Sequence, residues 1–135
     1  MKPLYKIFES LILEGVSPDI ISKTISDKKM ARITYNGDNN NSKGVRTIVP
    51  FLYGLHNSGH LAIRAWQLGG DTDTKIYKWK TFIAGSISSW EVRNGNAKSV
   101  LTALRNASDL PDYVGKSDKD FDEVYTYIPV SDYMS

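Results

Sequence analysis

Turn-forming residues divide residues 44–92 into segments of the length of β-strands. Residues 56–59 (His-Asn-Ser-Gly) predict one hairpin turn, residues 69–73 (Gly-Gly-Asp-Thr-Asp) predict a second, and Ala84-Gly85 marks a tight bend. The same stretch holds all three tryptophans. A chain with turns at these intervals folds into neighbouring antiparallel strands. We therefore predict that this stretch forms most of a small β-barrel, and that the rest of the chain packs around it.

Alternation of apolar and polar residues predicts where the strands lie. The expected strands are 30–35, 45–55, 60–68, 75–83 and 86–93. Pro50 falls inside the second strand and cannot donate a hydrogen bond, so it predicts a bulge or an edge. The polar segment 36–44 is expected to be a loop.

Helices are predicted on both sides of the barrel. Residues 3–14 show helical spacing, and Ser17-Pro18-Asp19 begins a second helix with a capping hydroxyl and an early proline. The buried stripe of this second helix is predicted to be Ile20, Ile21, Thr24 and Ile25. A further helix is expected over residues 97–107, and alternation after Phe121 predicts a last strand.

These elements make one α+β domain over residues 1–135. We divide it into N-terminal helices (1–29), a barrel (30–93), and a helix with an acidic C-terminal strand or tail (94–135).

Composition excludes several classes of site. The chain has no cysteine, so disulfides and thiolate chemistry are excluded, and His56 and His60 are too few for a histidine metal cluster. We expect no metal and no cofactor. No apolar run reaches the roughly 20 residues that cross a bilayer, so we expect a cytoplasmic protein without a membrane partner.

Charge is distributed unevenly along the chain. Residues 1–107 hold fifteen Lys and Arg against eight Asp and Glu, whereas residues 108–135 hold two against seven. One interpretation is a basic body that binds an anion, with an acidic tail that packs on the body or competes with the anion. The other is a solvated surface with an acidic end.

Cationic and aromatic residues alternate along the predicted strands. Cations neutralise phosphate and exposed rings stack bases, so this pattern is typical of a nucleotide or single-stranded nucleic-acid site. The candidate residues are Arg46, Tyr53, Arg64, Trp66, Gln67, Tyr77, Lys78, Trp79 and Lys80. Alternation puts Arg64 and Trp66 on one face and Gln67 on the other, so some of these residues must belong to the core.

The order of several short motifs resembles the WYL-domain family over roughly residues 20–92. The residues that carry the resemblance are Ile25, Ser26, Ile33, Thr34, Tyr35, Gly44, Arg46, Pro50, Gly54, Gly59, Ile63, Arg64, Ala65, Trp66, Gln67, Gly70, Trp79, Lys80, Phe82 and Ile87. The Trp-Tyr-Leu triplet that names the family would fall near Leu61-Ala62-Ile63 and is not retained. The downstream basic pair would fall near Ile83 and Ser86, neither of which is basic.

The resemblance implies an SH3-like or Sm-like β-barrel that senses a nucleotide or nucleic acid. In that family such a domain often controls transcription or a defence system. This chain would be a short stand-alone member of a phage or bacterial type, in the cytoplasm of a bacterium or of a phage-infected host. A protein partner and homodimerisation are further expectations, which no residue pattern carries.

The residues do not predict catalysis. His56 and His60 flank a turn without a serine or carboxylate at relay spacing, and Asp71 and Asp73 lack the rest of a calcium loop. Two functions therefore stay open: a ligand-sensing regulatory module, or a phage structural or host-takeover interaction protein that uses the barrel as a scaffold. In a third alternative, residues 108–135 fold over the groove and compete with the ligand.

Overall fold

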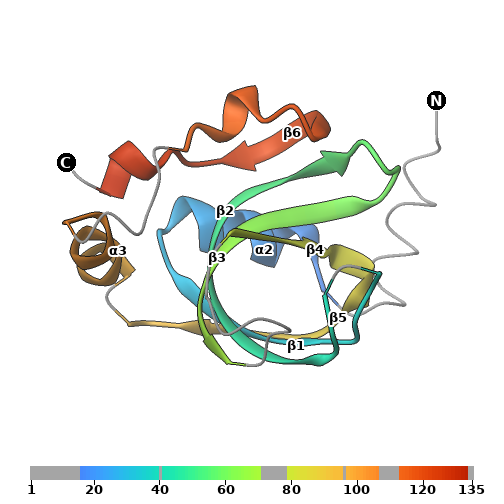
Figure 1. Ribbon diagram of the computed structural model, residues 1–135, viewed down its shortest axis with the longest axis horizontal. Coiled ribbons are helices and arrows are strands. Elements are labelled where there is room, and N and C mark those ends of the chain that lie inside the picture. The colour runs from blue at the N-terminus through green and yellow to red at the C-terminus, as the bar shows by residue number, and fades with distance from the viewer. Residues whose placement is uncertain (1–15, 40, 71–78, 96, 107–112, 134–135) are drawn as a thin grey trace.

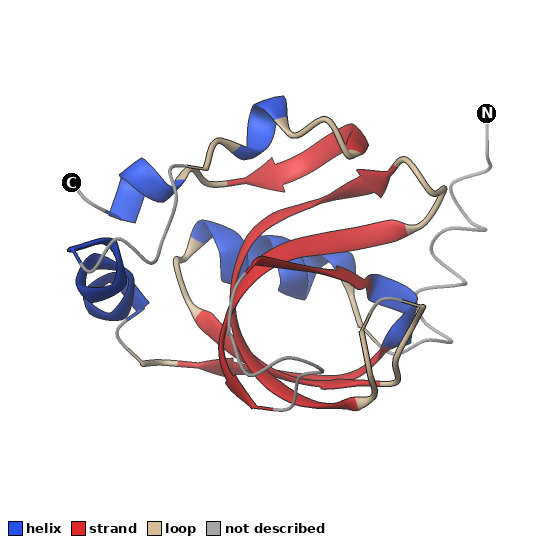
Figure 2. Cartoon of the chain, in the orientation of Figure 1, coloured by secondary structure: helices blue, strands red, loops and turns tan. Residues whose placement is uncertain are grey.

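The computed structural model describes residues 16–39, 41–70, 79–95, 97–106 and 113–133 of the chain (Figure 1). It is an α+β fold built on a six-stranded, antiparallel sheet (Figure 2). The helices are α2 (Pro18–Ser26) and α3 (Ala97–Asn106), and the short 3-10 turns are η1 (Ala84–Ser86), η2 (Gly115–Ser117) and η3 (Val130–Tyr133). The strands are β1 (Met30–Tyr35), β2 (Gly44–His56), β3 (Leu61–Gly70), β4 (Trp79–Ile83), β5 (Ile87–Arg93) and β6 (Phe121–Tyr127). No helix in this part of the chain is long and apolar enough to cross a membrane.

The predicted local elements are largely confirmed. Helix α2 begins after Ser17, whose side chain accepts the Asp19 N–H at 3.2 Å. The prediction that Ile20 belongs to the buried stripe of α2 was wrong. Ile20 is 46% exposed, whereas Ile21 and Ile25 are fully buried. The Ile20 side chain lies about 100° from that of Ile21 around the helix, which turns it to solvent. The expected helix 3–14, the turn 71–73 and the strand positions 75–78 lie outside the described residues.

Strand β2 is the centre of the sheet. The strand order is β4-β3-β2-β1-β5, and β6 pairs with β2 off this path. Strand β3 runs along one edge of β2, while the other edge is shared: residues 44–48 pair with β1, and residues 52–56 pair with β6. Pro50 lies between these two ladders, at a register shift relative to β3. Proline, which has no N–H, is tolerated there, because neither the ladder with β1 nor the ladder with β6 needs a donor at this position.

The sheet curls strongly, yet no ladder joins its two end strands β4 and β5 in the described part (Figure 1). Side chains, rather than another strand, form hydrogen bonds with backbone groups on the outer edge of β4. The Tyr35 hydroxyl accepts the Ile83 N–H at 2.9 Å, and the Asn41 amide donates to the Thr81 carbonyl at 3.0 Å. The predicted antiparallel sheet is therefore present, whereas closure into a barrel by backbone pairing is not observed.

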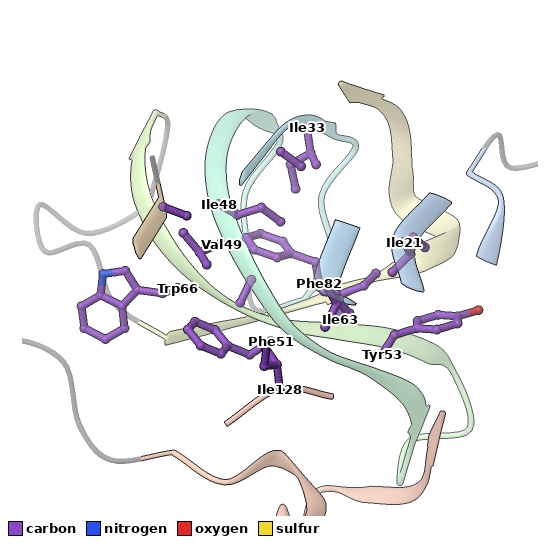
Figure 3. Close-up of a cluster of buried hydrophobic side chains, with 14 of the residues drawn as sticks. Ile21, Ile33, Ile48, Val49, Phe51, Tyr53, Ile63, Trp66, Phe82 and Ile128 are labelled. Atoms are coloured by element: carbon purple, nitrogen blue, oxygen red, sulfur yellow. The ribbon is translucent and has the colours of Figure 1, made fainter. Parts of the chain in front are cut away.

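Two groups of apolar side chains form the core. The larger joins the concave side of the sheet to α2 and to the C-terminal residues Ile128, Val130 and Tyr133. Trp66 belongs to the same group, although in Figure 3 its indole points away from Ile63 and Phe82. The smaller group consists of Leu52, Ala62 and Phe121, with the partly buried Tyr113 and Val124 against it. The C-terminal segment 113–133 is therefore part of the fold.

Candidate binding site

The predicted site residues are divided between two centres on opposite faces of β3. Arg64 contacts Asp118 and Asp120 of the C-terminal segment. Gln67 lies three residues after Arg64 on β3, so its side chain points to the other face. There it contacts Arg46 on the concave side. The sequence correctly separated these two residues by strand alternation. The structure therefore does not bring Arg46 and Arg64 into one groove.

The Arg64 centre consists of Arg64, Thr81, Tyr113, Asp118 and Asp120. The guanidinium donates to Asp118 from Nε at 3.1 Å and from Nη2 at 3.4 Å, and to Asp120 from Nη2 at 2.7 Å. Its Nη1 donates to the Thr81 hydroxyl, on the neighbouring strand, at 2.7 Å. All three nitrogens of the guanidinium therefore have acceptors within the chain.

Asp118 is the most enclosed acid of the Arg64 centre. Its side chain is 6% exposed, against 54% for Asp120. Besides Arg64, the Asp118 carboxylate accepts the Tyr113 hydroxyl at 2.6 Å and the Asp120 N–H at 3.0 Å. These contacts hold the turn 113–120 against β3 and β4.

Burial and charge act in opposite directions on the pKa values of Asp118 and Arg64. Burial alone would raise the pKa of Asp118, but hydrogen bonds from Arg64 and Tyr113 outweigh it, so the pKa lies below its ordinary value of 3.8. Burial alone would lower the pKa of Arg64, and the bonds with Asp118 and Asp120 raise it instead. Burial and the Asp118 carboxylate both raise the pKa of Tyr113. The Arg64–Asp118 pair is therefore fully ionised near neutral pH.

The aromatic residues next to this centre pack on one another. The Trp66 and Trp79 rings lie 5.5 Å apart at 88°, and the Tyr113 ring covers Trp79 at 4.6 Å. Trp66 is 5% exposed, and the Trp79 ring packs edge-on against it. Trp66 is therefore a core residue in this structure, and its role in stacking a base stays a prediction.

The Arg46 centre lies inside the curl of the sheet and consists of Tyr35, Ser42, Arg46, Gln67 and Phe82. Arg46 is fully buried and donates to the Gln67 amide oxygen at 3.2 Å and to the Ser42 backbone carbonyl. The faces of Tyr35 and Phe82 lie 5.8 and 5.4 Å from the guanidinium carbon. Arg46 Nε is buried without a hydrogen-bond partner. Arg46 and Gln67, both predicted to contact a ligand, are interior residues that fix the loop before β2.

The remaining predicted residues are placed separately. Tyr53 is 3% exposed, and burial, with a smaller effect of Tyr125, raises the pKa of its hydroxyl to about 12. Tyr53 is therefore also a core residue. Trp79 and Lys80 are half-buried on β4, and Lys78 lies outside the described residues.

Sequence reasoning missed the partners of both arginines. Asp118, Asp120 and Tyr113 lie 49 or more residues from Arg64 along the chain, so no local pattern links them to β3. The excess of acids in residues 108–135 was the one sequence feature that pointed to these partners of Arg64. One interpretation of it was an acidic tail that packs on the basic body, but it did not name the residues. For Ser42 and its contact with Arg46 the sequence held no signal.

The described residues contain no group of three or more His, Asp and Glu side chains that could hold a metal ion. Comparisons of the chain with protein-family models, with curated proteins and with solved structures each find no match. The resemblance to the WYL-domain family therefore stays a hypothesis, carried by the residues named above.

Proposed function

We propose that this chain is a non-catalytic protein-interaction module that uses a small SH3-like or Sm-like β-barrel as its scaffold. One observation carries the proposal: Arg64, the cation most expected to contact a ligand, already donates four hydrogen bonds to Asp118, Asp120 and Thr81 of its own chain. A phosphate would have to displace two carboxylates from this guanidinium.

The energetics of the C-terminal segment support the same proposal. Val130 and Tyr133 are fully buried, and Ile128 and Phe121 are less than a tenth exposed. Burial of each such side chain contributes about 1.5–3 kcal/mol, so lifting the whole segment off the sheet would cost several kcal/mol. A ligand that must remove residues 113–133 would bind weakly.

Nucleotide analysis of co-purified material tests the proposal. We expect the tagged full-length chain to retain a protein in fixed ratio and to release no nucleotide when it is denatured. A fluorescein-labelled oligothymidylate should show no binding that weakens with salt, since salt-dependent binding reports phosphate contacts. Nucleotide release, or oligonucleotide binding with a steep salt dependence, would overturn the proposal.

A second candidate is a nucleotide sensor whose site is occupied by its own C-terminal turn. The Tyr113 ring on Trp79 and the carboxylates on Arg64 together present a ring and anionic groups, as a nucleotide does. Deletion of residues 108–135 cannot test it, because the deletion also removes core residues. The Asp118→Asn/Asp120→Asn double variant should instead gain salt-dependent oligonucleotide binding under this alternative. Unchanged absence of binding in a folded double variant would dismiss it.

A further inference from the structure

Strand β6 has one unpaired edge. It pairs with residues 52–56 of β2, and no other strand in the described part of the chain pairs with it. In Figure 1 it lies beside the end of β2, outside the curl, with the η2 turn next to it. Free N–H and C=O groups along such an edge can pair with an added extended chain.

The direction of the backbone groups near the end of β6 follows from one hydrogen bond. The Ile128 N–H donates to the Phe51 carbonyl on β2 at 2.9 Å. Because successive N–H groups of a strand point to opposite edges, the Tyr127 N–H is directed to the open edge. The backbone N–H of Tyr127 is therefore a hydrogen-bond donor on the edge away from β2.

Exposed apolar side chains lie on β6 and on the turn that precedes it. Tyr125 is 48% exposed, Tyr127 is 40% exposed, and Val114 is 53% exposed. Val114 precedes Gly115, where an added Cβ would lie 3.1 Å from the Tyr127 Cβ. These are three of six large hydrophobic side chains exposed in the described residues. Tyrosine is enriched at protein interfaces, where it supplies contact area and a hydroxyl.

The negative charge of β6 indicates which kind of strand could pair with it. Asp122 and Glu123 are exposed on the strand, Asp120 directly precedes it, and the strand itself contains no Lys or Arg. Register shifts at Asp122 and Tyr125 and two carboxylates per strand disfavour pairing between two copies of β6. A strand rich in Lys or Arg has the complementary charge, so the acids favour a basic partner strand and disfavour an acidic one.

We propose that the open edge of β6 binds an extended basic segment of a partner protein as an added strand. Lysine or arginine side chains of that segment contact Asp122 and Glu123, and its apolar side chains contact Tyr125 and Tyr127. This inference rests on the proposed interaction function and names its surface and the chemistry of its partner.

A matched pair of glutamates tests the surface. Glu123 on β6 accepts the Tyr125 hydroxyl at 2.9 Å, and Glu91 on the other exposed end strand, β5, accepts Arg93 at 2.6 Å. Both carboxylates are exposed and pair with a residue two positions along, so Glu123→Lys and Glu91→Lys make the same charge change on two edges. The probe is a fluorescein-labelled nine-residue peptide of alternating lysine and valine, with a glutamate–valine peptide of the same length as its control.

We expect Glu123→Lys to weaken binding of the lysine–valine peptide about tenfold, as loss of one close charge pair does, and Glu91→Lys to change it less than twofold. Amide resonances of β6, including Tyr127, should shift and gain protection from hydrogen exchange when the peptide is added. Equal losses for both variants, tight binding of the glutamate–valine peptide, or shifts confined to β5 would each overturn the inference. Self-association lost in Glu123→Lys would also overturn it, by assigning the edge to a second copy.

The two proposals fail differently. If a co-purified protein binds Glu123→Lys as tightly as the unaltered chain, β6 is the wrong surface and the interaction function stands. If the co-purified material is nucleotide, the interaction function fails whatever the peptide does.

Discussion

The Tyr35 hydroxyl accepts the backbone N–H of Ile83 at 2.9 Å and so connects β1 to the open edge of β4. The same hydroxyl donates to the Asp38 carboxylate, which in turn accepts the Asn41 N–H at 2.7 Å. A side-chain network from the β1–β2 loop thus satisfies an edge that a closed barrel would satisfy with a strand. A tyrosine hydroxyl thus links β1 to the end strand β4 of the curled sheet.

Tyr35→Phe should destabilise the fold by about 1–3 kcal/mol, because it leaves the half-buried Ile83 N–H without an acceptor. Urea denaturation followed by tryptophan fluorescence measures the change. Tyr125→Phe is the control, since it removes a hydroxyl that bonds Glu123 at the surface, and it should change stability by less than about 0.5 kcal/mol. Equal losses in the two variants would show that the Tyr35 network does not hold β4.

Asp118→Asn should lower the free energy of unfolding by about 2–3 kcal/mol at neutral pH, because the Arg64 guanidinium loses its best-enclosed charge partner. The pKa of Asp118 is lowered in the folded state, so its ionised form stabilises the fold above its ordinary pKa, and this contribution is lost as pH falls through the folded pKa. The difference between the unaltered chain and Asp118→Asn should therefore be constant above about pH 5 and shrink below about pH 4. Chemical denaturation between pH 3 and pH 7 measures it.

Asp122→Asn is the matched control for that series. Asp122 is exposed on β6, and its amide variant should stay within about 0.5 kcal/mol of the unaltered chain at neutral pH. A stability difference for Asp118→Asn that stays constant down to pH 3 would contradict the role of the Arg64–Asp118 ion pair.

Arg46→Met should destabilise the protein by about 1–3 kcal/mol, since it removes the buried hydrogen bonds that Arg46 donates to the Gln67 amide oxygen and the Ser42 carbonyl. The double variant Arg46→Met/Gln67→Leu should recover part of the loss, because it replaces both members of a buried polar pair with apolar groups. Thermal denaturation of the unaltered chain, Arg46→Met, Gln67→Leu and the double variant gives the coupling energy. Strictly additive losses would argue against the buried Arg46–Gln67 contact.

Gly54→Ala should displace β6, because a methyl group at this position would overlap the Glu123 carbonyl of the paired strand. Gly69→Ala is the control, since no heavy atom lies within 4 Å of its added methyl group. We expect a loss of about 1–3 kcal/mol for Gly54→Ala, as for other overpacked sites, and a loss of amide protection in β6. Unaltered protection in Gly54→Ala would contradict the close approach of β2 and β6.

Local elements were predictable wherever neighbouring residues decide them. Ser17 caps α2, Gly59 takes the left-handed conformation at φ 90° in the β2–β3 hairpin, and Pro50 marks a register shift as expected. The alternation that put Arg64 and Gln67 on opposite faces of β3 was also correct. Each of these features depends on steric and hydrogen-bonding preferences within a few residues.

The site was predicted less well than the fold. Alternation cannot say which face of a strand becomes covered, because that depends on segments far away in the chain. Arg46 was expected to meet a ligand and is buried between Tyr35 and Phe82, and Trp66 packs against Trp79 in the core.

The sequence by itself determined an antiparallel, turn-punctuated sheet, a capped helix before it, and a charge imbalance between the body and the C-terminal end. Only the tertiary structure decided that this acidic end crosses back to β2 and that Asp118 and Asp120 occupy Arg64. The physical reason is that strand and turn preferences act over a few residues, whereas the pairing of β6 with β2 and the ion pairs of Arg64 join residues more than fifty positions apart.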